Sequence, residues 1–205
     1  VFKQRNWTVA QVLPFDDPDW NYRAYAAASD YLILTAYDEH WSDAAPGSVA
    51  GQPWFEETLA KRMEELDGPH TVIGIGGYGY DWQYGGKTKA MTFQEALLEA
   101  RESEANVEFD PETRNPFFSY QEDDGSEHTV WFLDGVTAYN QMRASRPYNV
   151  AGFALWRLGS GDPPPWGGFG APRQRASPRR PHRPRPPDVR GFPGCPGGPR
   201  GAGVP

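Results

Sequence analysis

Four short runs rich in apolar and β-branched residues recur along the chain, and each gives way to polar or glycine-rich sequence. These runs are Trp7–Leu13, Tyr31–Tyr37, Thr71–Ile75 and Val150–Trp156. Apolar runs of this length with polar boundaries are typical of strands that are buried on both faces of a sheet. The pattern therefore predicts four buried strands.

Segments with helical patterning lie between these runs. They are Pro18–Ala28, Trp54–Leu66, Thr92–Ser103 and Leu133–Ser145. A proline in the first turn suits the start of the first helix, and Thr92 with Glu95 forms a capping box at the start of the third. Because strands that alternate with helices pair in parallel, the sequence predicts an α/β fold.

The sequence between the third and fourth strands departs from this alternation. Residues Gly76–Trp82 are rich in glycine and aromatic residues and predict a loop. Further on, Phe117–Tyr120 and His128–Phe132 flank the turn residues Asp123–Gly125, which predicts an antiparallel hairpin. The hairpin is therefore expected as an insertion after the third strand.

Two of the predicted strands end in residues that suit ligand binding. Tyr37 and Asp38 close the second strand, and Trp156 closes the fourth. In α/β barrels the carboxyl ends of the strands carry the active site. A hydroxyl, a carboxylate and an aromatic ring on one rim suit a sugar ring. Four strand–helix units make half a barrel; a small open sheet is the alternative, but the polar strand ends favour the barrel rim.

Length and charge divide the chain into two regions. The 205 residues fall short of the roughly 250 of a complete eight-stranded barrel. Residues 1–170 carry a net charge of −14, whereas residues 171–205 carry +7. The acidic region argues against a nucleic-acid partner, which needs a basic surface. It has no cysteine and hence no disulfide, and Cys195 stands alone in the second region.

The second region predicts a disordered tail. Pro, Arg and Gly make up 24 of the 35 residues from 171 to 205, a composition that cannot form a core. An Arg-rich arm for anionic partners is one alternative, and a GC-rich coding sequence read in a wrong frame is another. No apolar run reaches the roughly 20 residues of a membrane span. No signal peptide opens the chain, and Val1 in place of Met indicates a missing start.

In its motifs the chain resembles glycoside hydrolase family 18, the chitinase-like barrels. The resemblance rests on Leu34–Asp38, Gly74–Trp82, the hairpin and Gly152–Trp156, in this order. It implies a partial (β/α)8 TIM barrel that comprises roughly strands 5 to 8, with the hairpin after strand 7. The sequence of residues 37–40 and 156–162 is similar to that of one bacterial branch of the family. In this branch the hydrolase-like domain is fused to a polysaccharide deacetylase and a family 2 glycosyltransferase. That branch implies an extracytoplasmic or membrane-associated parent, with the membrane part outside this chain.

The resemblance also implies roles for the rim residues. In this family the acetamido oxygen of an N-acetylglucosamine polymer attacks the anomeric carbon, and the enzyme supplies one acid. Tyr37 is similar to the tyrosine that binds this oxygen, and Asp38 to the neighbouring aspartate. Trp156 matches the tryptophan that forms the floor of the subsite. Further sugar-binding candidates are Tyr78, Tyr80, Trp82, Asp16 and Asp17.

Several candidates have plainer alternatives. Each of these side chains could instead pack or face water, and Trp156 could belong to a core. Glu39 and His40 favour a structural role over a metal site, and His128 favours a cross-strand partner. Arg157 could pair with an acid or bind the substrate. Residues Gly74–Gly79 are not followed by a predicted helix, as a dinucleotide site requires, so no cofactor is expected. No metal is expected either, because His40 has no second His at helical spacing.

One departure from the family bears on activity. The family's acid ends a run of aspartates on the fourth strand, which is expected upstream of Trp7 and is missing here. The chain is therefore expected to be an inactive fragment of a chitinase-like hydrolase. A non-catalytic glycan-binding or structural module is the alternative, and a non-functional translation product is a third.

Overall fold

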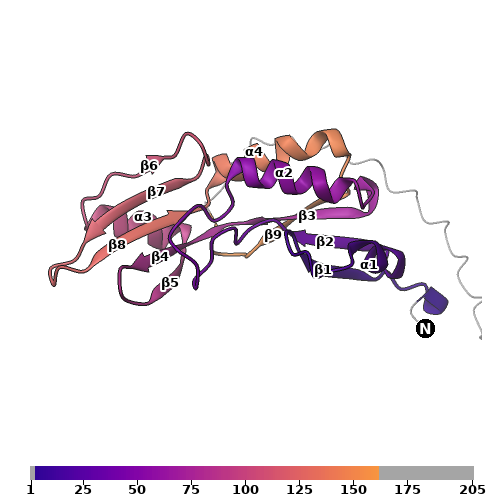
Figure 1. The fold of residues 1–205 in the computed structure, drawn as a ribbon, viewed down its shortest axis with the longest axis horizontal. Coiled ribbons are helices and arrows are strands. Elements are labelled where there is room, and N and C mark those ends of the chain that lie inside the picture. Colours follow the sequence, from indigo (N-terminus) through magenta and orange to yellow (C-terminus); the bar gives the residue numbers. More distant parts are fainter. Residues whose placement is uncertain (1–2, 162–205) are drawn as a thin grey trace, which may run out of the picture. The chain divides into compact units, whose positions relative to one another are not determined.

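A computed structural model describes residues 3–161 of the chain (Figure 1). The predicted tail, residues 171–205, lies outside them, so its disorder stays a prediction. In the described residues, four strands form a parallel sheet in the order β1-β2-β3-β9. These strands are β1 (Ala10–Pro14), β2 (Tyr31–Thr35), β3 (Thr71–Gly76) and β9 (Gly152–Trp156). The predicted parallel pairing of the four runs is confirmed.

Helices cover one face of this sheet. The α-helices of the described residues are α1 (Tyr22–Ala28), α2 (Gln52–Met63), α3 (Phe93–Glu102) and α4 (Gly135–Ser145). Short 3-10 helices are η1 (Lys3–Arg5), η2 (Gly68–His70) and η3 (Arg146–Tyr148). Helices α2 and α4 lie side by side over the sheet (Figure 1). Leu34 and Ile73, which are in register, join Phe55 and Leu59 of α2 in the main core, from which water is excluded.

The opposite face of the sheet is only partly covered. Val12, Ile33 and Val72 lie in one register row on that face. Val12 is 61% exposed, and the other two side chains are partly buried. The prediction of strands buried on both faces is therefore wrong for β1, β2 and β9, because the helices pack on one face only, whereas β3 is buried at five of its six residues. In the same residues β1 and β9 each pair along one edge.

The segment between β3 and α4 forms a second sheet, larger than the predicted hairpin. Its order is β5-β4-β8-β7-β6, and all pairs are antiparallel. The strands are β4 (Tyr78–Gln83), β5 (Thr88–Thr92), β6 (Glu108–Phe109), β7 (Pro116–Gln121) and β8 (Glu127–Phe132). Strands β7 and β8 form the predicted hairpin within this sheet. The predicted loop Gly76–Trp82 is instead mostly strand β4, because its backbone pairs with β5 on one side and with β8 on the other.

Helix α3 belongs to the second sheet and not to the third strand–helix unit. Its Ala96 and Ala100 pack against Met91, Phe118 and other apolar side chains of the antiparallel strands. Helix α4 covers the parallel sheet where α3 was expected, and its Ala138 packs into the main core. The capping box is confirmed: Glu95 N donates to Thr92 Oγ1 at 3.1 Å, and Thr92 N donates to Glu95 Oε2 at 2.7 Å.

The first two helices begin away from their predicted starts. Helix α1 begins at Tyr22 because the side chain of Asn21 caps it, accepting a hydrogen bond from Ala24 N at 3.0 Å. Helix α2 begins at Gln52, two residues early, and Pro53 occupies its first turn. No helix in residues 3–161 combines the length and the apolar character that a bilayer crossing requires.

The charged side chain of Arg62 lies inside the core. The guanidinium of Arg62 in α2 is 2% exposed and lies 3.8 Å from the ring centroid of Tyr22. Its Nε donates to the carbonyl oxygen of Phe15 at 2.9 Å, and its Nη1 lies 3.1 Å from Glu65 Oε1. Arg62 therefore joins α2, α1 and the loop after β1.

Candidate functional site

A cleft of about 210 Å³ lies where the strands of the parallel sheet end. It is lined by Asp38, Tyr78, Tyr80, Ala90, Met91, Thr92, Glu95, Trp156, Arg157 and Ser160. Asp38 follows β2, Tyr78 follows β3, and Trp156 ends β9. The cleft thus occupies the carboxyl-terminal edge, where barrel enzymes bind their substrates.

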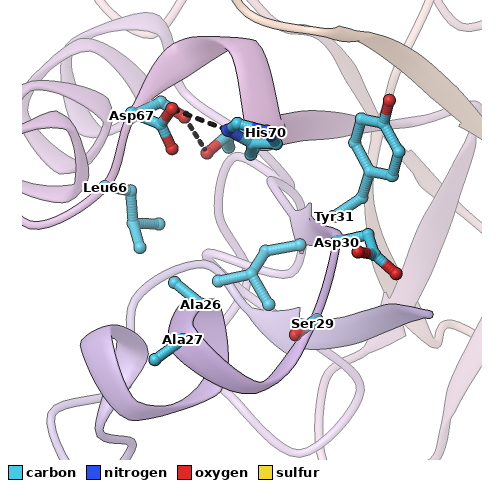
Figure 2. Close-up of a pocket in the computed structure, with 10 residues that line it drawn as sticks. Ala26, Ala27, Ser29, Asp30, Tyr31, Leu66, Asp67 and His70 are labelled. Carbon is cyan, nitrogen blue, oxygen red and sulfur yellow. Dashed lines mark hydrogen bonds and ion pairs between the residues drawn. The ribbon is translucent and has the colours of Figure 1, made fainter. Parts of the chain in front are cut away.

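A second hollow, of about 280 Å³, lies at the opposite edge, where β2 and β3 begin (Figure 2). Ala26, Ala27 and Leu66 contribute apolar surface to it. Its ionisable neighbours Asp67 and His70 are joined to each other by a hydrogen bond of 2.7 Å (Figure 2). No predicted site residue is among the described residues that line it, so the carboxyl-terminal cleft is the better candidate.

Tyr37 is half-buried and is not among the residues that line the cleft, but it packs against Tyr78, which is. Its ring lies against Gly74 and Gly76 of β3: a β-carbon at Gly74 would come within 3.5 Å of Tyr37 Cε1, and one at Gly76 within 3.1 Å of Tyr37 Cβ. The ring also meets that of Tyr78 edge-on at 5.8 Å. Within residues 3–161 the Tyr37 hydroxyl has no hydrogen-bond partner, so it can donate to a ligand.

Asp38 has an uncommon backbone conformation and two phenol partners. Its φ of +64° is in the left-handed region, which few non-glycine residues adopt. Its Oδ1 accepts a hydrogen bond from the hydroxyl of Tyr78 and another, of 2.9 Å, from the hydroxyl of Tyr80. Burial raises the pKa of both phenols, and the charge of Asp38 raises it further. Both phenols therefore stay protonated donors at neutral pH.

Trp156 offers an aromatic surface to the cleft. Its side chain is 55% exposed, which is unusual for so large an apolar group. The next residue, Arg157, also lines the cleft, and its carbonyl oxygen accepts a 2.9 Å hydrogen bond from the hydroxyl of Ser160. An exposed indole beside polar groups suits a ligand with an apolar face and a hydroxylated rim.

Three predicted sugar-binding residues lie away from the cleft. Trp82 is 4% exposed and its indole N–H donates to Ala44 O at 3.1 Å, so its ring packs in the interior. Asp16 Oδ1 lies 3.5 Å from Lys61 Nζ and 3.7 Å from Arg62 Nη2. Asp17 accepts a hydrogen bond from Asp19 N. The structure gives these three side chains packing and local pairing, and their contact with a sugar stays a prediction.

The remaining polar candidates make structural contacts. Glu39 Oε2 accepts hydrogen bonds from Ser48 Oγ at 2.7 Å and Gly51 N at 2.6 Å, which tie the loop to the start of α2. His40 Nδ1 lies 3.0 Å from Ala45 O, and His128 Nδ1 lies 2.8 Å from Asp81 Oδ1. No group of three His, Cys, Asp or Glu side chains in residues 3–161 is placed to hold a metal ion.

The cleft also contains residues that sequence reasoning did not assign to it. Met91, Thr92 and Glu95 come from the end of β5 and the start of α3, which the sequence placed in a separate unit. The backbone N–H of Thr92 holds the pKa of Glu95 below its usual value. Glu95 is therefore ionised at neutral pH. Its capping-box spacing identified it as a helix cap, and no sequence signal pointed to the cleft.

The buried phenols predict a loss of stability at high pH. Burial, and then the charge of Asp38, raises the pKa of Tyr37 to about 12, above the ordinary tyrosine value of 10.0. The neutral phenol therefore stabilises the fold below pH 10, and this contribution is lost as pH rises towards 12. We expect the free energy of unfolding to fall over this range, less steeply for Tyr37→Phe. Urea denaturation at several pH values measures the slope; Tyr84→Phe, at an 88% exposed position, should leave it unchanged.

No family model matches the chain. The sporulation-specific glycosylase YdhD of Bacillus subtilis (strain 168) is 30% identical over 152 residues, which are 72% of this chain and 36% of that protein. The cortical fragment-lytic enzyme of the same organism is 26% identical over 151 residues, which are 71% of this chain and 35% of that enzyme. The chain thus spans about a third of the length of these curated relatives.

Solved structures similar to this chain also include chitinases. The chitinase of Chromobacterium violaceum ATCC 12472 matches with a TM-score of 0.72 and 29% identity, over 79% of this chain and 54% of that one. Together with the parallel strands and their helices, this match supports an α/β barrel-type fold. The homologues and structural neighbours of this chain are glycosylases and chitinases.

Proposed function

We propose that the chain is the C-terminal half, roughly strands 5 to 8, of a chitinase-like barrel, and that it binds polymers of β-1,4-linked N-acetylglucosamine. The observation that carries this proposal is the shared edge of Asp38 and Trp156, which line one cleft at the ends of parallel strands. The half-covered face of the sheet supports the partial barrel, because a barrel interior is filled by side chains of all its strands.

The site residues suit an N-acetylated sugar. The hydroxyl of Tyr37 is a free directional donor for the acetamido oxygen. The exposed indole of Trp156 covers one face of the pyranose, and the carboxylate of Asp38 accepts hydrogen bonds at the edge of the ring. In the parent, this frame would orient the acetamido oxygen for attack on the anomeric carbon, with retention of configuration.

Hydrolysis needs a proton donor as well as this frame. The described cleft holds two carboxylates, those of Asp38 and Glu95. Asp38 already accepts two phenol hydroxyls, and Glu95 has a lowered pKa, so neither suits the role of general acid. The family's glutamate, on the fourth barrel strand, is the acid that we propose for the parent.

The names of the relatives support a location and leave an alternative. One relative is named for sporulation and the other for cortical fragments, which supports a place outside the cytoplasm or in the spore for the whole protein. Fusion to a deacetylase and a glycosyltransferase remains a prediction. The unsuited carboxylates favour the second candidate function, a glycan-binding module without hydrolysis, if the parent also lacks the glutamate.

We expect the purified chain to bind tetra-N-acetylchitotetraose but not to cleave a fluorogenic chitobioside. Loss of general acid catalysis alone is worth about 10²–10⁴-fold in rate. Titration calorimetry measures binding, with cellotetraose as a control that lacks the acetamido groups. Cleavage that Tyr37→Phe abolishes would show that an acid is present after all. Equal affinity for the two sugars, or no binding, would overturn the proposed ligand.

A further inference from the structure

One carboxylate oxygen of Asp38 accepts two hydrogen bonds in the cleft. The hydroxyls of Tyr78 and Tyr80 both donate to Oδ1. The two tyrosines are two residues apart on β4, so their side chains point to the same side of the strand. Their rings meet edge-on with centroids 5.6 Å apart, and the ring of Trp82 continues the row at 5.4 Å from Tyr80. This packing fixes the position of both hydroxyls.

The second oxygen of Asp38 remains available. No donor in residues 3–161 forms a hydrogen bond with Oδ2. A carboxylate oxygen has about two acceptor positions, and those of Oδ1 are taken by the two phenols. Rotation of the carboxylate would break both bonds, so Asp38 presents Oδ2 in one orientation. The left-handed backbone at Asp38 is held in the same way, because the side chain is tied to the second sheet.

We propose that Tyr78 and Tyr80 are positioning residues for Asp38 and do not themselves bind the sugar. This inference rests on the proposed glycan site and changes the role that the sequence suggested for the two tyrosines. The hydroxyl protons of both are directed at Oδ1. Tyr80 is 9% exposed and Tyr78 is half-buried, which limits the phenol surface that a ligand could reach. The chemistry that they supply is a fixed acceptor for an N–H or O–H group of the sugar.

A double-mutant cycle tests the proposal in the full chain. Tyr78→Phe removes one hydroxyl, and Asp38→Gly removes the carboxylate while glycine tolerates the positive φ. We expect Tyr78→Phe to weaken binding of tetra-N-acetylchitotetraose about tenfold in the native background and to have no effect beside Asp38→Gly. Tyr80→Phe should behave in the same way, and Tyr84→Phe, outside the cleft, should change nothing. A direct sugar contact would instead weaken binding in both backgrounds, which overturns the proposal.

A second readout needs no ligand and separates this inference from the proposed function. The native chain, Tyr78→Phe, Asp38→Gly and the double variant are compared by the midpoint of thermal unfolding. Coupled midpoints, in which the shift caused by Tyr78→Phe disappears beside Asp38→Gly, support the positioning role even if no sugar binds. In that case the proposed function fails and the positioning role stands. Additive shifts overturn the positioning role whatever the sugar does.

Discussion

Replacing Arg62 with alanine is expected to lower the free energy of unfolding by about 3 kcal/mol. The side chain is almost fully buried, and among the largest fully buried side chains of residues 3–161 it alone carries a positive charge. Its removal would leave the carbonyl oxygen of Phe15 without its 2.9 Å donor and would open a cavity beside Tyr22. A desolvated cation over an aromatic ring adds about 2 kcal/mol to such a contact. Urea denaturation measures the change.

Lys61 provides a matched control for this experiment. It approaches the same carboxylate, Asp16, at 3.5 Å, but its side chain is 54% exposed. Exposed ion pairs contribute about 0–1 kcal/mol, so Lys61→Ala should change stability little. Arg62→Met keeps most of the volume and should fall between the two. Arg62 Nη2 lies beyond hydrogen-bond distance of Asp16, so the ion pair is not expected to dominate. Equal effects of Lys61→Ala and Arg62→Ala would contradict stabilisation by the buried contacts of Arg62.

Truncation of Trp156 is expected to weaken binding of tetra-N-acetylchitotetraose about 30-fold. The indole lines the cleft and is more than half exposed, so a sugar that covers it gains a large apolar contact. Removal of a tryptophan at the centre of a binding site costs about 2 kcal/mol, which corresponds to this factor. Calorimetric titration of Trp156→Ala against the native chain measures the loss.

Two further variants separate stacking from other effects. Trp156→Phe keeps an aromatic face and should lose less affinity than the alanine variant. Trp41→Ala removes an indole that is 49% exposed but outside the lining of the cleft, and it should bind as the native chain does. If Trp41→Ala and Trp156→Ala lose affinity equally, the sugar does not bind specifically in this cleft.

The parallel sheet could be predicted from the sequence because its signals are local. Apolar runs such as Tyr31–Tyr37 are long enough to define a strand and to show where it ends. Parallel pairing then brings the strand ends to one edge, which is why Asp38 and Trp156 line the same cleft. The lengths of the apolar runs and the rule of parallel pairing are enough to predict this part of the site.

The other wall of the cleft could not be predicted in the same way. The glycines of residues 76–79 indicate a loop, yet β4 uses Gly79 where Phe132 of the neighbouring strand comes very close. The alternation of Tyr78, Tyr80 and Trp82 is the local signal for this strand, and the neighbouring glycines obscure it. Glu95 reaches the cleft through long-range pairing of β5 with β4, and no local pattern encodes that contact.

The passage from β3 to β4 needs a single residue, Gly77, whose N–H still donates to Trp156 O at 2.8 Å. The second sheet therefore cannot be deleted from this fold, or exchanged between homologues, without changing the cleft. A chimera joined at that glycine would carry its own Tyr78 and Tyr80 equivalents into the recipient. Grafting this sheet transplants half of the ligand pocket with it.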